Sequence, residues 1–215
     1  MPSLTRFRWL SERIPAADQR RIVVVTGARQ TGKTTLARAV YPDLRYVNLD
    51  DVEAREALRA TRTTAWARTV GHAVLDEAQK EPAVFEKVKY AFDEGSVDFT
   101  VLLGSSRFLL LEQIRESLAG RAFLYDMWPL MLSELAVEAG ERPARPLFDA
   151  LLRPAAGIDQ VLEEQPEVLL GEDEERRRAA FDHLGRWGGL PATHWPDLSH
   201  TIGTASALAV LRWLS

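Results

Sequence analysis

Residues 22–35 read Ile-Val-Val-Val-Thr-Gly-Ala-Arg-Gln-Thr-Gly-Lys-Thr-Thr, an apolar run that ends in the pattern Gly-x-x-x-x-Gly-Lys-Thr. This pattern is typical of a loop whose backbone N–H groups surround the phosphates of a nucleoside triphosphate. The β-branched run before it predicts a strand, and residues 33–40 suit a helix whose N-terminus would point at the bound anion. The stretch therefore predicts a phosphate-binding loop between a strand and a helix.

Each fixed residue of this loop has a physical role. Gly27 and Gly32 allow the tight turns that point successive N–H groups inward. Lys33 places a positive charge against the β- and γ-phosphates, and Thr34 offers a hydroxyl to Mg²⁺. The predicted nucleotide-binding residues are Gly27, Ala28, Arg29, Gln30, Thr31, Gly32, Lys33, Thr34 and Thr35.

The composition is that of an ordinary globular protein. The 215 residues carry a formal net charge of −4, so there is no overall attraction to nucleic acid or to an anionic membrane. The absence of cysteine excludes disulfides, thiolate catalysis and cysteine-based zinc sites. No apolar run is long enough to cross a bilayer, and the N-terminal residues lack the apolar core of a signal peptide. We therefore expect a cytoplasmic protein.

Strands and helices alternate along the first 127 residues. The expected strands cover about residues 22–26, 44–51, 72–77, 99–106 and 122–127. The expected helices cover residues 33–40, 52–68, 107–118 and the stretch after Pro82, with one more, of residues 3–13, beside the first strand. Asp50 or Asp51 should cap the helix of residues 52–68. This alternation predicts an α/β fold, a parallel sheet with helices on both faces and functional residues at the carboxyl ends of its strands.

The sequence changes character after Trp128-Pro129. Residues 130–139 suit a helix, and Pro143, Pro146 and Pro154 mark a loose connecting segment. Residues 172–178 are a charge run at helical spacing, with acids ahead of bases, as on a solvated helix face. Residues 185–191 predict a turn, and residues 199–214 a modestly amphipathic helix.

Two carboxylates follow the third expected strand. Asp76 at the strand tip can hold Mg²⁺, and Glu77 is placed to polarise the water that attacks the γ-phosphate. An Asp-Glu pair after a strand is common, but here it follows the phosphate-binding loop with one strand and one helix between. The pair therefore favours hydrolysis over simple binding.

Other polar residues have two interpretations each. Ser105 and Ser106 end the fourth strand, where one of them either contacts the γ-phosphate or attacking water, or only caps a helix. Arg107 and Arg121 are either surface cations or the source of further charge neutralisation, in cis or from a neighbouring subunit. The four histidines show no metal-ligand spacing.

Together these residues resemble a large family of bacterial and archaeal AAA-fold ATPases, whose members join an N-terminal P-loop ATPase to a C-terminal domain of unknown function. The resemblance rests on residues 27–36, 46–50, 75–80, 103–106, 117–121 and 129–135, and on Gly-Gly-Leu-Pro at residues 188–191. It is close over about residues 20–135. Members continue well past the Gly-Gly-Leu-Pro motif, whereas this sequence ends at Ser215. We therefore expect an ATPase domain of residues 1–135 and a helical extension, or partial second domain, of residues 136–215.

The resemblance implies an AAA-type fold in which an additional strand lies between the phosphate-binding strand and the Asp76 strand. It implies ATP and Mg²⁺ as cofactors, with Lys33 and Thr34 on the nucleotide and metal, Asp76 on the metal and Glu77 as the catalytic base. A sensor-like role follows for Ser105 or Ser106, and Arg121 falls in a recurring family motif. The partners that it implies are ATP or ADP, together with further copies of the chain in a homo-oligomer or a partner protein. Nucleic acid is left open as a partner, although the net charge of the chain does not favour its binding.

Three functions remain in competition. The first is an Mg²⁺-dependent ATPase that acts as a molecular switch. The second is a P-loop kinase for a small molecule, against which the Asp76-Glu77 pair argues, because a hydrolytic base beside the metal would be counterproductive. The third is a nucleotide-binding regulatory module with little turnover. The preference for ATP over GTP is left open.

Overall fold

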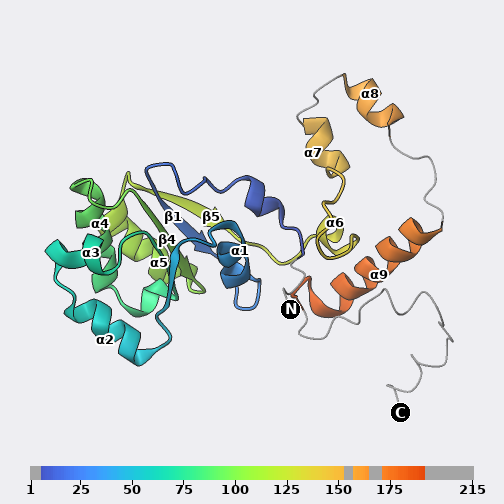
Figure 1. The fold of residues 1–215 in the computed structure, drawn as a ribbon. Coiled ribbons are helices and arrows are strands. Elements are labelled where there is room, and N and C mark those ends of the chain that lie inside the picture. Colours follow the sequence, from blue (N-terminus) through green and yellow to red (C-terminus); the bar gives the residue numbers. More distant parts are fainter. Residues whose placement is uncertain (1–5, 153–156, 165–170, 192–215) are drawn as a thin grey trace, which may run out of the picture.

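The computed structural model describes residues 6–152, 157–164 and 171–191. At its centre is a five-stranded sheet in the order β2-β3-β4-β1-β5, in which all neighbouring strands are parallel (Figure 1). The strands are β1 Arg21–Thr26, β2 Arg45–Asn48, β3 Ala73–Asp76, β4 Phe99–Gly104 and β5 Ala122–Asp126. All five expected strands are confirmed, and β4 lies between β1 and β3 as the additional strand should.

Helices cover both faces of this sheet because its strands are apolar on both sides. Ile22 and Val24 of β1 face one buried cluster, whereas Val23 and Val25 face the other. The first cluster includes side chains from α2 Val52–Ala60, α3 Trp66–Thr69, α4 Ala83–Asp93 and α5 Arg107–Gln113. The second is covered by α1 Lys33–Val40 and by the N-terminal segment. The alternation follows from the two-residue period of a strand, and the predicted α/β fold is confirmed.

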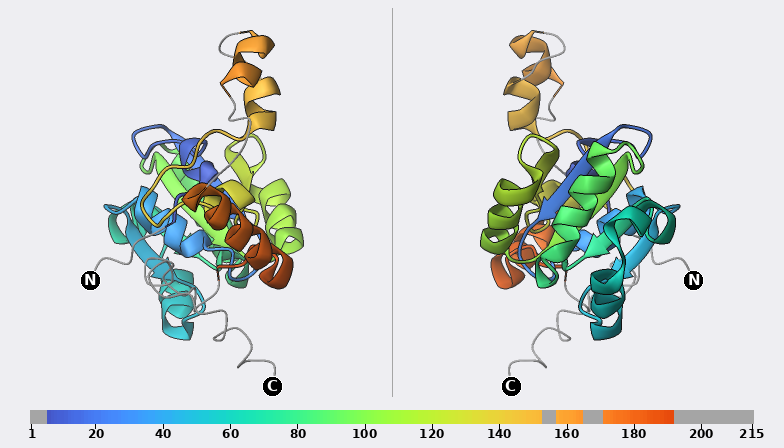
Figure 2. Two further views of the ribbon diagram at one scale, coloured as in Figure 1. Left: turned by 90° about the vertical axis from the view of Figure 1, so that its right-hand side faces the viewer. Right: turned by 90° about the vertical axis from the view of Figure 1, so that its left-hand side faces the viewer.

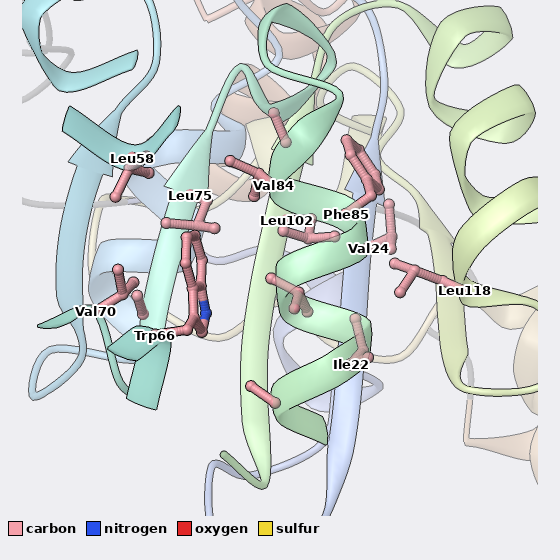
Figure 3. Packing of buried hydrophobic residues seen from close by; sticks show 14 of the residues in the cluster. Ile22, Val24, Leu58, Trp66, Val70, Leu75, Val84, Phe85, Leu102 and Leu118 are labelled. Atoms are coloured by element: carbon pink, nitrogen blue, oxygen red, sulfur yellow. The ribbon is translucent and has the colours of Figure 1, made fainter. Parts of the chain in front are cut away.

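The helix α4 lies along the strands on the first face, and its side chains fill the space between helix and sheet (Figure 3). Val84 and Phe85 of α4 pack with Val24, Leu75 and Leu102 of three neighbouring strands. This packing fixes the strands whose carboxyl ends carry the polar residues.

The expected helix of residues 52–68 is interrupted. Asp51 caps α2 by accepting a hydrogen bond from Glu53 N at 2.9 Å, but α2 ends at Ala60, where Thr61 adopts an extended conformation. The Thr61 hydroxyl bonds the carbonyl of Ala57 at 2.8 Å, and the chain continues in a short 3-10 helix of Thr63–Ala65 before α3. The break allows the fully buried Trp66 to enter the first cluster.

The N-terminal residues also differ from the expected helix of residues 3–13. Residues 1–5 lie outside the described part, and only Trp9–Glu12 form a short 3-10 helix. Arg8 is extended at φ −131° and ψ 122°. The guanidinium groups of Arg6 and Arg8 bond carbonyls far along the chain, at Val137 and Trp128. These long-range contacts outweigh local helix formation.

The C-terminal part is helical, with bounds that differ from the expected ones. Its helices are α6 Leu132–Leu135, α7 Leu147–Leu152, α8 Ile158–Glu163 and α9 Glu172–Trp187. The helix expected over residues 130–139 is only α6, and α7 and α8 were not expected. The predicted turn of residues 185–191 begins later, because α9 continues to Trp187 and is ended by Gly188 at φ 61°. The predicted helix of residues 199–214 lies outside the described residues.

The helices of this part pack unequally. Leu130, Leu135 and Ala180 form a small buried cluster that joins α6 to α9. The helices α7 and α8 stand away from the sheet in both views of Figure 2. Among the described residues, no helix is long and apolar enough to cross a membrane.

Candidate nucleotide-binding site

The predicted phosphate-binding loop lies between β1 and α1, and its backbone requires the glycines. Gly32 caps α1 at φ 93°, and Gln30 is also in the left-handed region at φ 62°. A Cβ at Gly27 would lie 2.2 Å from the carbonyl oxygen of Met127, the residue after β5. The chain directly after β5 therefore packs against the loop so closely that only glycine fits at position 27.

Lys33 lies inside this loop. Its Nζ donates hydrogen bonds to the carbonyls of Gly27 at 2.9 Å and Ala28 at 2.8 Å, and the residue is only 6% exposed. Burial lowers the pKa of Lys33, and the carboxylates of Glu77 and Asp76 oppose that shift by favouring the charged form. The arrangement keeps a cation, partly stripped of water, beside both carboxylates.

Asp76 ends β3 next to the N-terminus of α1. Its Oδ2 accepts hydrogen bonds from Thr34 Oγ1 at 2.5 Å and from the Tyr46 hydroxyl at 2.8 Å, and its Oδ1 accepts one from the backbone N–H of Glu77 at 2.9 Å. Burial raises the pKa of Tyr46 to about 12, and the hydrogen bond and charge of Asp76 add to the effect. Tyr46 therefore stays a hydrogen-bond donor across the physiological pH range.

A Mg²⁺ ion fits this donor set. The described residues contain no group of three His, Cys, Asp or Glu side chains that could hold a metal by itself. One carboxylate and one hydroxyl that already converge, Asp76 and Thr34, are the hard oxygen ligands that Mg²⁺ takes when phosphates and water complete its shell. The site therefore suits a metal that arrives with a nucleotide.

Glu77 follows in an unusual backbone conformation, with φ 54° and ψ 41°. Its Oε2 accepts hydrogen bonds from Gln79 Nε2 at 2.5 Å and from Ser105 Oγ at 3.0 Å. Ser106 occupies the N-cap position of α5 but makes no side-chain capping bond. Of the two serines, Ser105 is the one that the structure brings to the carboxylates.

Arg121 is not brought to the loop. It precedes β5, at the amino end of the strand, whereas the phosphate-binding loop follows the carboxyl end of the parallel strand β1. Its guanidinium forms a two-pronged ion pair with Asp93 at the end of α4, with Nε–Oδ1 at 2.5 Å and Nη2–Oδ2 at 3.0 Å. Arg107 is the first residue of α5. Within one chain, Arg121 lies at the amino ends of the strands, and the predicted ATP site lies at their carboxyl ends.

Arg8 and Glu134 are site residues that sequence reasoning missed. The Arg8 guanidinium donates to the Thr31 carbonyl in the loop at 2.7 Å and to the Trp128 carbonyl at 2.5 Å. Its Nε lies 3.2 Å from Glu134 Oε2, and the two residues are 8% and 1% exposed. Burial lowers the pKa of Arg8, and Glu134 opposes the shift. No local pattern signals a contact between charges so distant in sequence.

Glu134 is itself held by the backbone on both sides. Its Oε1 accepts from Trp9 N at 2.7 Å, and its Oε2 accepts from Met131 N at 3.0 Å. Through Arg8 and Glu134, the N-terminal segment, the loop and α6 form one connected polar network.

Comparison with known proteins agrees with this geometry. A family model described as AAA domain matches residues 19–136, more than half of the chain. The chain belongs to the AAA domain family. The resemblance seen over residues 20–135 is thereby confirmed.

Two curated relatives of this AAA chain are the uncharacterized proteins Mb2031c of Mycobacterium bovis and Rv2008c of Mycobacterium tuberculosis. Each is 32% identical over 123 residues, which cover 56% of this chain but 28% of the relative. The chain thus spans less than a third of the length of the curated relatives it matches.

Solved structures with some likeness to this AAA chain include the Walker-type ATPase PABY2304 of Pyrococcus abyssi, at a TM-score of 0.40 and 16% identity, with 91% of this chain and 70% of that chain covered. The ORC1 protein of Aeropyrum pernix, solved in complex with DNA, has a TM-score of 0.38 and 16% identity, with 81% and 62% covered. The assignment rests on the family model and the strand order, and not on these likenesses.

Proposed function

We propose that this protein is an Mg²⁺-dependent ATPase of the AAA type that acts as a molecular switch, converting ATP and water to ADP and phosphate. One observation carries the proposal above the others. Thr34 Oγ1 and Asp76 Oδ2 converge to 2.5 Å at the end of the phosphate-binding loop, directly beside Glu77. This is the arrangement that phosphoryl transfer to water needs, with metal ligands and a base side by side.

Each residue has a role in this proposal. The backbone of residues 27–35 surrounds the phosphates, and Lys33 contributes its charge to the β- and γ-phosphates. Thr34 and Asp76 hold Mg²⁺, which when bound neutralises the charge of the phosphates. Glu77 accepts a proton from the water as its oxygen bonds to the γ-phosphorus, and the bond to the β–γ bridging oxygen breaks, with its electron pair leaving on ADP.

In this proposal Arg121 contributes its positive charge to the ATP site of a neighbouring subunit. Its place at the amino ends of the strands supports a role in trans, because one chain does not bring it to its own loop. Turnover per chain should then rise with protein concentration, because each site would be completed only in an oligomer. Arg121→Ala with unchanged turnover at every protein concentration would exclude Arg121 from catalysis.

We also propose that residues 1–135 form the ATPase domain and residues 136–215 a helical extension or partial second domain. The polar network around Glu134 supports a boundary close to residue 135, since α6 still contacts the loop through Arg8.

The test of hydrolysis is phosphate release from ATP by purified protein. Glu77→Gln should retain ATP binding and lose roughly a hundredfold or more of the turnover, as expected when a positioned base is removed. The exposed Glu53, which undergoes the same change in Glu53→Gln, is the matched control and should behave as the unaltered protein. Removing Mg²⁺ with a chelator should stop turnover. Unchanged turnover in Glu77→Gln contradicts the role of Glu77, and label transferred to a metabolite instead of water would favour a kinase.

A second candidate is a nucleotide-binding regulatory module with little turnover. The two-pronged pairing of Arg121 with Asp93 favours it, because a guanidinium already neutralised within its own chain does not supply charge to a neighbouring ATP site. Tight ATP binding without phosphate release at any protein concentration would support this module over the ATPase.

A further inference from the structure

The side chain of Gln79 lies between the two elements that meet at Glu77. Gln79 belongs to a 3-10 turn of Ala78–Lys80 that follows Glu77 directly. Its Nε2 is 2.5 Å from Glu77 Oε2 and 3.4 Å from Ser105 Oγ, and Ser105 Oγ donates to the same carboxylate oxygen at 3.0 Å. The three side chains form a closed triangle, in which one oxygen of Glu77 receives two donors from separate elements.

Close packing fixes the amide of Gln79 in this place. A Cβ added at Gly104, at the tip of β4, would lie 2.3 Å from Gln79 Oε1. The amide therefore rests directly on the backbone of β4, and any side chain at position 104 would displace it. Gly104 thus leaves the space that the amide of Gln79 occupies.

The orientation of the amide points to the carboxylate as its partner. Gln79 Oε1 is buried and has no hydrogen-bond partner among the described residues. Leaving a buried acceptor unpaired costs free energy. The side-chain amide would therefore flip, exchanging the positions of Oε1 and Nε2, if nothing opposed it. The charge of Glu77 opposes this flip, because the flipped amide would place the oxygen of Gln79 against a carboxylate oxygen of Glu77.

We propose that Gln79 is a positioning residue that orients the carboxylate of Glu77 for attack by water. This inference rests on the proposed hydrolytic role of Glu77. With Oε2 occupied by Gln79 and Ser105, the other oxygen, Oε1, is the one left to accept a proton. Two donors from separate elements also restrict the rotation of the carboxylate. Pre-organisation of this kind accelerates the chemical step without changing how tightly ATP binds.

The test replaces Gln79 by methionine, which keeps the length of the side chain and removes the amide. Gln79→Met should lower kcat roughly ten- to a hundredfold, as expected for a hydrogen bond to a charged group, and change KM for ATP by less than about twofold. In the Glu77→Gln background, Gln79→Met should have no further effect, because the two act as a unit.

The matched control is Gln160→Met. Gln160 also donates to a glutamate, Glu164, at 3.1 Å, but on the surface of α8. It should leave kcat and KM unchanged. If Gln79→Met folds poorly, Ser105→Ala removes the second donor of the triangle from another element and should also lower kcat.

One readout does not depend on turnover. The side-chain amide signals of Gln79, assigned by their loss in Gln79→Met, should shift in the ¹H–¹⁵N spectrum of Glu77→Gln and of Ser105→Ala. Amide signals that do not move would overturn the contact, whatever the activity. Normal or raised kcat in Gln79→Met, with Glu77→Gln still inactive, would overturn the positioning role alone. Turnover that Glu77→Gln leaves intact would instead remove the proposed function.

Discussion

Tyr46 shows how a single residue can matter to the candidate site without touching the nucleotide. Its hydroxyl donates to the same oxygen of Asp76 that Thr34 contacts, and Arg38 stacks over its ring at 4.1 Å from the centroid. A partner behind a metal ligand fixes the orientation of that ligand. The sequence predicts that Tyr46 lies in the second strand, but it does not indicate which strand lies beside it. In the structure β2 pairs with β3, and Asn48 lies beside Asp76.

Tyr46→Phe should therefore weaken the site without abolishing it. We expect the Mg²⁺ concentration for half-maximal turnover to rise roughly tenfold, as is typical when a residue behind a metal ligand is lost. The exposed Tyr90, changed in Tyr90→Phe, controls for loss of a phenol elsewhere. Titration of turnover with Mg²⁺ at saturating ATP measures the effect, and equal half-saturation in all three proteins would argue against the contact.

At the level of elements, the chain directly after β5 and the phosphate-binding loop act as one unit. Met127 N donates to the carbonyl of Thr26 at 2.7 Å, and the Met127 carbonyl approaches Gly27. The segment after β5 thus continues the sheet ladder just where the loop begins. Nucleotide binding should depend on this contact as much as on the glycines themselves.

Gly27→Ala should lose most of its affinity for ATP, because the new Cβ would lie 2.2 Å from the Met127 carbonyl and force the two segments apart. Gly157→Ala is the control, since nothing lies within 4 Å of a Cβ there. Calorimetric titration with ATP compares the two variants. Affinity within about threefold of the unaltered protein for Gly27→Ala, about 0.65 kcal/mol, would contradict the close packing.

The elements predicted best from the sequence are those with a strong local signal. The five strands follow from apolar runs, and α1 follows from the loop motif, so their bounds agree with the structure within a few residues. The break at Thr61 was not predicted because no Gly or Pro marks it, and the gain from burying Trp66 comes from tertiary packing. The triangle of Glu77, Gln79 and Ser105 escaped for a similar reason, since it depends on β3 and β4 being neighbours.

Over the whole molecule, the buried pair of Arg8 and Glu134 joins the N-terminal segment to the end of the AAA domain. Removing one partner of a buried ion pair leaves the other charge without compensation, which costs about 3–5 kcal/mol in such sites. Glu134 also receives two backbone N–H groups, so its loss affects three segments at once.

Glu134→Gln should accordingly lower the free energy of unfolding by about 3 kcal/mol. The exposed pair of Glu12 and Arg142, at 2.8 Å, offers the control Glu12→Gln, which should cost less than about 1 kcal/mol. Denaturant unfolding followed by tryptophan fluorescence measures both changes. A cost for Glu134→Gln no larger than that of the surface variant would mean that the buried pair does not stabilise the fold.

The position of Arg8 also bears on where a shortened, recombinant form of the protein should begin. The family model starts at residue 19, so a protein cut at that limit would keep every residue of the Gly-x-x-x-x-Gly-Lys-Thr motif. It would lose the side chain that holds the Thr31 and Trp128 carbonyls together, and Glu134 would stay buried without its cation. The family domain thus begins at residue 19, whereas the contacts that hold the phosphate-binding loop begin at Arg8.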